Sequence, residues 1–301
     1  MEDWASRRRV IEEGRYGVSP AGRHAAGHKR PFKIVVATLG RVLRFTPLYA
    51  RGRHNALAVQ RVEMDIALPG LPAAFDGYRI LHVSDTHLDY LPELAGVARG
   101  LLAGVEVDML ALTGDIHGDH TNPLERSIEL LTEAVGEVRV RGPRLAVLGN
   151  HDPSTMAALL ERAGFDVLLN RSIVLEQEGA RLRFTGLDDV NTFYTEAARS
   201  ALGDHAGEFR IALVHSAEVA DYADDAGYAL YLCGHTHGGQ IALPGGWPLV
   251  THLRRCRHAA SGLWRQGRMA GYTNRGLGVS DLPLRFNTRG EVVVITLRQG
   301  S

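Results

Sequence analysis

The sequence lacks several features that would assign it to a special class. Only two of its 301 residues are cysteine, which excludes a disulfide framework and is compatible with a reducing compartment. No apolar run reaches the roughly 18 residues expected of a membrane-spanning helix. Neither sign of charge is in excess, with 34 basic and 34 acidic residues, and hydrophobic residues make up 45%. This composition excludes a wholly disordered chain and a polytopic membrane protein, and it indicates one large domain or two small ones.

The zero net charge hides an uneven distribution. Residues 1–61 contain 13 basic and four acidic residues, a net charge of +9, so residues 62–301 carry −9. We interpret residues 1–31, which show no hydrophobic period, as a mobile basic arm. Residues 32–61 form an amphipathic basic segment, in which residues 32–50 would be a helix that lies on the domain or on an anionic membrane. A single domain would cover residues 62–301.

The N-terminal basic residues also have an alternative interpretation. Ser6 to Val10 is similar to a twin-arginine export signal, but polar residues follow where such a signal has an apolar region. We therefore expect a cytoplasmic protein, which the basic segment would attach peripherally to the inner face of the membrane.

From residue 62 onward, β-type apolar runs alternate with helical stretches, which predicts an α/β fold. The strongest β-type runs are Tyr78–Val83, Val105–Leu112, Arg144–Leu148, Phe209–Val214 and Tyr228–Cys233. Helices are expected near Leu91–Leu102, Pro123–Val135 and Ser154–Ala163, three short strands over Phe165–Gly186, and a last strand over Glu291–Leu297.

Each of the five strongest runs is followed directly by a side chain that can bind a metal ion. Ligands of open α/β sheets lie outside the carboxyl ends of the strands, so these side chains would meet at one rim. Taken singly, each has an ordinary explanation as a helix cap, a turn or a buried polar group. Taken together and in order, they predict a functional site. The candidates are Asp85, His87, Asp115, Asn150, His151, Asp152, His215, His235 and His237.

The ordered set resembles the calcineurin-like metallophosphoesterase superfamily. The pattern of that family is D-x-H, G-D, G-N-H-[DE], H and G-H-x-H, and every block is present between Asp85 and His237 without substitution. Flanking residues, such as 77–80 and 275–278, are similar to a bacterial branch of membrane-associated phosphodiesterases. The resemblance implies two mixed β-sheets packed face to face and flanked by helices, an αββα sandwich.

The resemblance also implies two adjacent divalent metal ions, bridged by Asp115. Imidazole, carboxylate and amide ligands without a cysteine suit Mn²⁺, our first choice, and also Fe or Zn²⁺. The implied ligands are Asp85, His87, Asp115 and His237 for one ion, and Asp115, Asn150, His215 and His235 for the other.

The implied reaction is hydrolysis of a phosphodiester or pyrophosphate bond by a hydroxide that bridges the two metals. His151 would donate a proton to the leaving oxygen or stabilise developing charge, and Asp152 would orient His151 or its loop. His117 and Arg275 are the candidate substrate-binding residues, with ordinary surface positions as their alternative.

The basic segment favours a phosphorylated lipid-linked or nucleotide-linked substrate at a membrane surface. Two further enzymes fit the same pattern: a soluble nucleotide phosphodiesterase, and a UDP-diacylglucosamine pyrophosphatase of lipid A synthesis. A non-catalytic scaffold is disfavoured because no ligand of the pattern is lost. Nucleic-acid binding is disfavoured because the basic arm lacks an aromatic-interleaved patch and the rest of the chain is acidic.

Overall fold

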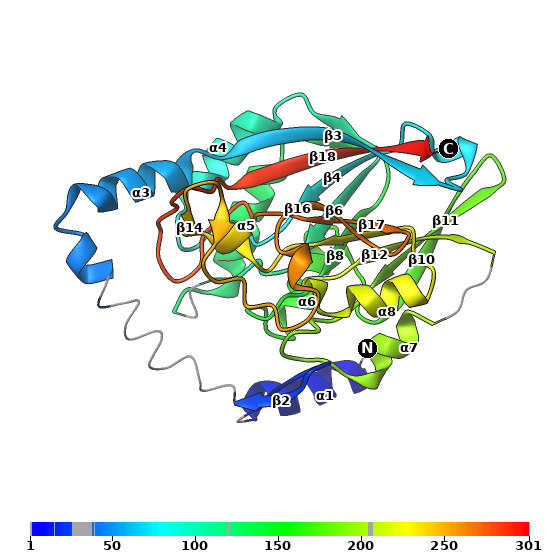
Figure 1. Ribbon diagram of the computed structural model, residues 1–301, viewed down its shortest axis with the longest axis horizontal. Coiled ribbons are helices and arrows are strands. Elements are labelled where there is room, and N and C mark those ends of the chain that lie inside the picture. The colour runs from blue at the N-terminus through cyan, green and yellow to red at the C-terminus, as the bar shows by residue number, and fades with distance from the viewer. Residues whose placement is uncertain are drawn as a thin grey trace.

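Two six-stranded β-sheets lie at the centre of the computed structural model, which describes residues 2–14, 16–25, 38, 40–118, 121–203 and 207–300 (Figure 1). The first sheet has the order β3-β18-β4-β6-β8-β9, with strands Gln60–Pro69, Glu291–Gly300, Arg79–Val83, Met109–Thr113, Arg144–Val147 and Asp166–Val167. The second has the order β10-β11-β12-β13-β17-β16, with strands Arg171–Gln177, Ala180–Gly186, Phe209–Leu213, Leu230–Cys233, Met269–Thr273 and Gly262–Gln266.

The two sheets pack face to face through one apolar cluster. Ile80 and Met109 of the first sheet and Phe184 and Ile211 of the second belong to this cluster. Because strand side chains alternate between faces, Leu81 points the other way and joins the cluster under the helices. Strands that are covered on both faces are apolar throughout, and this is why the sequence shows them as continuous apolar β-type runs.

Helices cover the outer face of each sheet. Helices α4 (Glu93–Leu102), α5 (Leu124–Val135) and α6 (Met156–Arg162) pack on the first sheet. Helices α7 (Glu196–Ala201) and α8 (Ala220–Asp225) pack on the second. The fold is therefore α/β, as the apolar runs predict, and it is the αββα sandwich that the family resemblance implies.

Short elements complete the body. The predicted run Val105–Leu112 is divided into β5 (Glu106–Val107) and β6, and β5 pairs with β7 (Arg139–Val140). Strands β14 (Ala242–Leu243) and β15 (Trp247–Pro248) form a hairpin. Single turns of 3₁₀-helix span Ala73–Phe75, Ala217–Val219, His237–Gly239 and Arg257–Ala259.

The segment before residue 62 differs from the sequence prediction. Pro47 lies inside the stretch 32–50 that was expected to form one helix, but it is the first residue of α3 (Pro47–Leu57), where proline fits because the amide of that position has no helical partner. Gly52 of α3 packs against Phe286 and Leu284. Strand β3 then pairs in parallel with β18, so the first sheet begins at Gln60. Residues 32–37 and 39 of the predicted amphipathic segment lie outside the described part of the chain.

The predicted mobile arm also differs from the structure where it is described. Residues Glu2–Glu13 form helix α1, and β1 (Tyr16–Ser19) and β2 (Gly22–Ala25) form an antiparallel hairpin. Helix α1, dark blue in Figure 1, lies at the opposite side of the view from β3 and β18. It is held by polar side chains rather than by an apolar stripe, so hydrophobic periodicity gave no signal for it. Residues 1, 15 and 26–31 of the predicted arm are outside the described residues.

None of the helices in the described part of the chain combines the length and apolar character needed to span a bilayer.

Candidate metal centre

The candidate residues follow parallel strands that end at a common rim. In the first sheet, β4, β6 and β8 run parallel and lead into Asp85, Asp115 and Asn150. In the second sheet, β12 and β13 run parallel and lead into His215 and His235. Side chains separated by up to 150 residues in sequence are brought together because parallel strands place their carboxyl ends on the same side.

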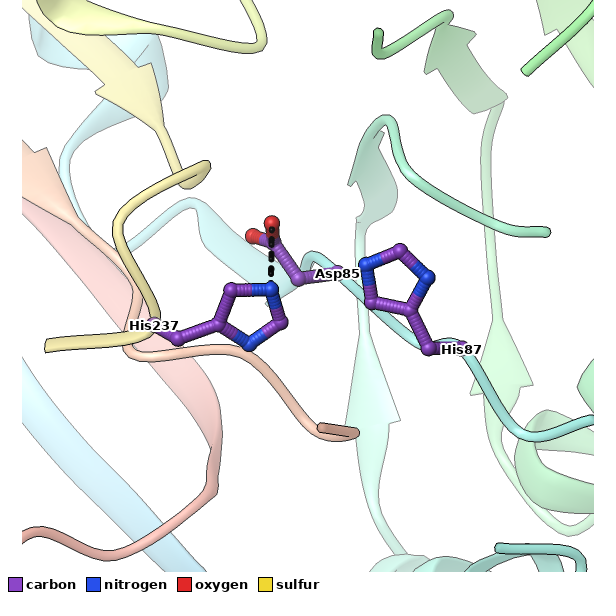
Figure 2. A group of neighbouring side chains, drawn as sticks. All are labelled: Asp85, His87 and His237. Carbon is purple, nitrogen blue, oxygen red and sulfur yellow. Dashed lines mark ion pairs between the residues drawn. The ribbon is translucent and has the colours of Figure 1, made fainter. Parts of the chain in front are cut away.

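The first group of possible metal ligands consists of Asp85, His87 and His237. Their ligand atoms all lie within 4.8 Å of one another, and all three residues are buried. Figure 2 shows the Asp85 carboxylate above the His237 ring, with Oδ1 at 3.5 Å from Nε2. The imidazoles of His87 and His237 are stacked, with ring centroids 5.2 Å apart.

The second group consists of Asp115, His215 and His235, again buried and again within 4.8 Å. Nε2 of His215 is its centre: it lies 3.3 Å from Asp115 Oδ2 and 3.2 Å from His235 Nδ1. The amide oxygen of Asn150 lies 3.3 Å from the same nitrogen. The structure thus places the four residues of the second implied ligand set around one point.

Asp115 connects the two groups. Its Oδ2 lies 3.3 Å from Nε2 of His215 and 3.5 Å from Nε2 of His87. A carboxylate in this position can offset the repulsion between two cations held side by side.

Backbone carbonyls fix the orientation of two of the histidine rings. Nδ1 of His87 lies 2.9 Å from the carbonyl oxygen of His117, and Nδ1 of His215 lies 2.8 Å from that of Thr113. Since a carbonyl only accepts, Nδ1 donates in both cases, and Nε2 is the nitrogen that faces the site and can offer a lone pair to a metal once it is deprotonated. Among the residues that the structure describes, Nε2 of His87 is buried without a hydrogen-bond partner, as expected of a metal ligand. The donor set and its support therefore fit divalent metal ions.

The backbone is strained at the candidate ligands. Asp85, His87, Asp115, His235 and His237 all have positive φ, between 35° and 74°. Non-glycine residues pay about 1–3 kcal/mol each for such conformations, and they persist where the surroundings over-determine them. Because five such residues lie in one cluster, we infer that the unfavourable backbone conformations are kept since they direct these side chains toward the site.

Burial and mutual charge set the protonation of the site. Burial disfavours both the Asp115 carboxylate and the His215 imidazolium, but each stabilises the charged form of the other. The pKa of Asp115 is therefore held well below its usual range, and the pKa of His215 rises to about 10. Burial raises the pKa of Asp85 to about 6. Burial and the neighbouring His87 lower the pKa of His237 well below its ordinary value, which leaves a neutral imidazole.

His151 and Asp152 follow Asn150 on the same loop. The His151 ring is partly exposed and meets the His87 ring edge to face, with centroids 5.1 Å apart, and its amide donates to Asp115 Oδ1 at 2.8 Å. Asp152 is buried, and its carboxylate accepts amide hydrogens from Ile116, His117 and Gly149 at 2.8–3.0 Å. Asp152 thus holds the loop of residues 149–152 against the loop that carries Asp115.

The two predicted substrate-binding residues are placed differently from each other. His117 is only 2% exposed, its Nδ1 lies 3.0 Å from Ser127 Oγ, and its carbonyl supports His87. The structure therefore puts His117 behind the ligands, because the short loop after Asp115 folds inward there. Arg275 lines a cavity of about 530 Å³ beside the rim, with Nη1 2.6 Å from Glu291 Oε2.

Several residues at the rim were not among the sequence candidates. Asp188 and Asp189 follow β11, so the strand-end rule that identified the others would have found them. Asp189 is fully buried and caps the turn to Thr192, with its Oδ2 2.7 Å from that amide. Arg285 is fully buried and donates to the carbonyls of His237, Arg275 and Gly278 at 2.7–3.0 Å. A lone arginine far from any motif gives no sequence signal of this kind.

Comparison with known proteins agrees with this geometry. A family model described as calcineurin-like phosphoesterase matches residues 78–239. The chain is 32% identical over 255 residues to the "Uncharacterized metallophosphoesterase YkuE" of Bacillus subtilis (strain 168), across 80% of this chain and 86% of that protein. It is 28% identical over 259 residues to the "Uncharacterized metallophosphoesterase YkoQ" of the same organism, across 83% and 95%. It is 26% identical over 229 residues to the "Phosphodiesterase YaeI" of Escherichia coli (strain K12), across 73% and 82%. The chain therefore belongs to the calcineurin-like phosphoesterase family and is a metal-dependent hydrolase of phosphoric esters.

Proposed function

We propose that this enzyme hydrolyses a phosphodiester or pyrophosphate bond in a lipid-linked or nucleotide-linked substrate at a membrane surface. The observation that carries the proposal is the single carboxylate oxygen of Asp115, which lies between His87 and His215 and joins two buried ligand groups. Two adjacent metal sites are typical of in-line displacement at phosphorus.

The side chains divide the work. Seven residues would hold the metals: Asp85, His87, Asp115, Asn150, His215, His235 and His237. When bound, two divalent cations, Mn²⁺ in our proposal, would supply a water acidic enough to attack phosphorus and would neutralise charge on the phosphoryl oxygens. His151 has a partly exposed ring beside His87, from where it would donate a proton to the leaving oxygen. Asp152 keeps His151 in place by binding three backbone amides of the surrounding loops.

The cavity beside the metal centre supports an anionic substrate. Gly238, which directly follows His237 in sequence, lines the cavity. Three basic residues line it as well: His54, Arg275 and Arg289. At about 530 Å³ it has the size of a small-molecule site, larger than a lone phosphate requires. We therefore assign it to the nucleotide or lipid headgroup, with Arg275 as a substrate-binding residue.

The surface around this cavity supports the membrane context. Val42, Phe45 and Leu48 before and within α3 are exposed, and Phe45 is 92% exposed. Exposed arginines at 41, 44 and 51 alternate with them. Gly245 and Gly246 of the β14–β15 hairpin line the cavity, and Trp247 of the same hairpin is 73% exposed. Leu243, Leu249 and Val250 nearby in sequence are exposed as well. Apolar side chains interleaved with arginines are typical of proteins that bind anionic lipid surfaces.

One experiment tests the reaction. Protein loaded with Mn²⁺ is assayed with bis-p-nitrophenyl phosphate and p-nitrophenyl phosphate, and with nucleotide diphosphates and UDP-linked or lipid-linked pyrophosphates. Asp115→Ala is expected to abolish turnover and metal binding together, and the exposed Asp225→Ala serves as the matched control. Full turnover by the Asp115 variant, or turnover that a chelator leaves unchanged, would contradict the proposal.

A second experiment tests the membrane surface. Phe45→Ser and Trp247→Ser are expected to weaken co-sedimentation with phosphatidylglycerol vesicles, whereas Val10→Ser, which changes an exposed side chain on α1, is expected to bind like the unchanged protein. Equal binding by all variants, together with a preference for free nucleotides, would favour the soluble nucleotide phosphodiesterase instead.

A further inference from the structure

One face of helix α1 contacts the loop that carries Asn150 and His151 and also the loop that follows β11. Trp4, Arg8 and Glu12 are spaced four residues apart and therefore lie on the same side of the helix. Each makes hydrogen bonds to residues far away in sequence, after β8 or after β11. Helix α1 thus joins the rim of the first sheet to the rim of the second.

Arg8 makes the central contacts. It is only 2% exposed, and its Nη2 donates to the carbonyl oxygens of Gly149, at 3.0 Å, and Asp152. Its Nη1 pairs with the buried Asp188, and the guanidinium lies over the ring of Phe193 at 4.0 Å from the centroid.

Glu12 and Trp4, on the same face of α1 as Arg8, add further hydrogen bonds to these two loops. Glu12 accepts from the amide of Ser154 at 2.7 Å and from its hydroxyl at 3.1 Å, and it also accepts from Nε of Arg8 at 3.0 Å. The indole of Trp4 donates to Asp188 at 2.7 Å. The loop of residues 149–154 is therefore bonded to α1 at both of its ends.

This loop carries Asn150 and His151, and Arg8 binds the carbonyls that flank this pair. On the inner side of the loop, the Asp152 carboxylate bonds to the loop of Asp115. On the outer side, only a long planar side chain with several donors can reach two carbonyls and a carboxylate at once. Burying a guanidinium is costly, and an apolar anchor would dock a helix without that cost. The contacts of Arg8 therefore point to positioning of the loop rather than to docking of the helix alone.

We propose that Arg8 is a positioning residue of the active site, and that α1 sets the geometry of Asn150 and His151 through it. The expected loss of turnover rests on the proposed function. The expected loosening of residues 149–154 rests on the contacts of Arg8 alone. An N-terminal segment that precedes the catalytic body in sequence thereby becomes part of the catalytic apparatus.

The test compares Arg8→Ala and Arg8→Lys with Arg9→Ala. Arg9 is exposed on the same helix, so its variant removes the same charge without the contacts. Turnover of bis-p-nitrophenyl phosphate with Mn²⁺ is normalised to the folded fraction measured by circular dichroism. We expect kcat of both Arg8 variants to fall by about 10- to 100-fold with KM nearly unchanged, the range typical of residues that orient metal ligands. We expect millimolar methylguanidine to restore part of the activity of Arg8→Ala and none to Arg8→Lys, whose ammonium still occupies the site.

Hydrogen exchange of the backbone amides of residues 149–152 and 154 is measured on the same full-length variants. Faster exchange in Arg8→Ala than in Arg9→Ala is expected, and it tests the contact even if the unchanged protein hydrolyses none of the substrates. Unchanged exchange in this loop would overturn the inference. Faster exchange with kcat within about twofold of the unchanged enzyme would show that α1 holds the loop without positioning the catalytic residues, which also overturns it.

Discussion

Substitution of Gly149 tests how closely the two loops that carry Asp115 and Asn150 must pack in the candidate metal centre. A Cβ added at this position would lie 2.1 Å from Asp115 Oδ1 and 2.4 Å from the Asp115 amide nitrogen, where ordinary contacts are 3.4–4 Å. The alanine variant must therefore displace one of the two loops by more than 1 Å. Both loops carry candidate ligands, and Asp115 Oδ1 also accepts the His151 amide.

The size of the effect follows from that displacement. A misplacement of about 1 Å in a catalytic arrangement costs roughly 100-fold in rate, so kcat of Gly149→Ala is expected to fall by about 100-fold. Overpacking a tight site costs about 1–3 kcal/mol of stability, and the melting temperature should fall accordingly. The manganese content per chain is expected to fall too, because the displaced carboxylate is that of Asp115, which belongs to both ligand groups.

Gly96 provides the matched control. It lies within α4, is exposed, and an added Cβ would have nothing within 4 Å. Gly96→Ala should raise stability by about 0.5–1 kcal/mol, because alanine is the better helix former. Turnover, manganese content and melting temperature are measured for both. A Gly149→Ala enzyme with full manganese content and kcat within about threefold of the unchanged enzyme would refute the steric reasoning.

Two further predictions concern protons. His151→Ala should bind manganese normally yet lose about 10²–10⁴ in kcat, because it removes a proton donor and no ligand; a loss of metal content would contradict this role. Metal binding should release protons, because His215, with its pKa of about 10 in the metal-free protein, is charged at neutral pH and must lose its proton to coordinate. Affinity should therefore rise with pH until about 10, and calorimetry in buffers of different ionisation enthalpy should detect the released proton.

The strand-end rule explains why much of the site could be predicted. Buried parallel strands are apolar on both faces, so each run is visible in the sequence, and the polar residue that follows it is forced to the rim. The strand-end pattern therefore predicts that Asp85, Asp115 and His215 lie close together, although it gives no distance between them. The distances themselves, and the shared position of Asp115 Oδ2, depend on sheet packing that no local pattern encodes.

The sequence pattern does not predict the helix of the N-terminal segment, and the reason is physical. Helix α1 is anchored by Trp4, Arg8 and Glu12, whose contacts are hydrogen bonds and ion pairs to distant loops. Hydrophobic periodicity cannot find such a helix. Strand β3 was missed although its alternating residues Val62, Met64, Ile66 and Leu68 carry the period of two, with Ile66 and Leu68 buried.

The place of β18 in the first sheet constrains how the enzyme matures. This strand follows every other strand in sequence, yet it lies between β3 and β4 and pairs with both (Figure 1). During synthesis this sheet cannot be completed until β18 has left the ribosome, because among the described strands β3 pairs in it with β18 alone. The nascent chain therefore presents two unpaired strand edges for most of its synthesis, and such edges are prone to aggregation. Assembly of the rim around Asp85, at the end of β4, is thus a late event, and the enzyme should gain activity only after its whole body has been made.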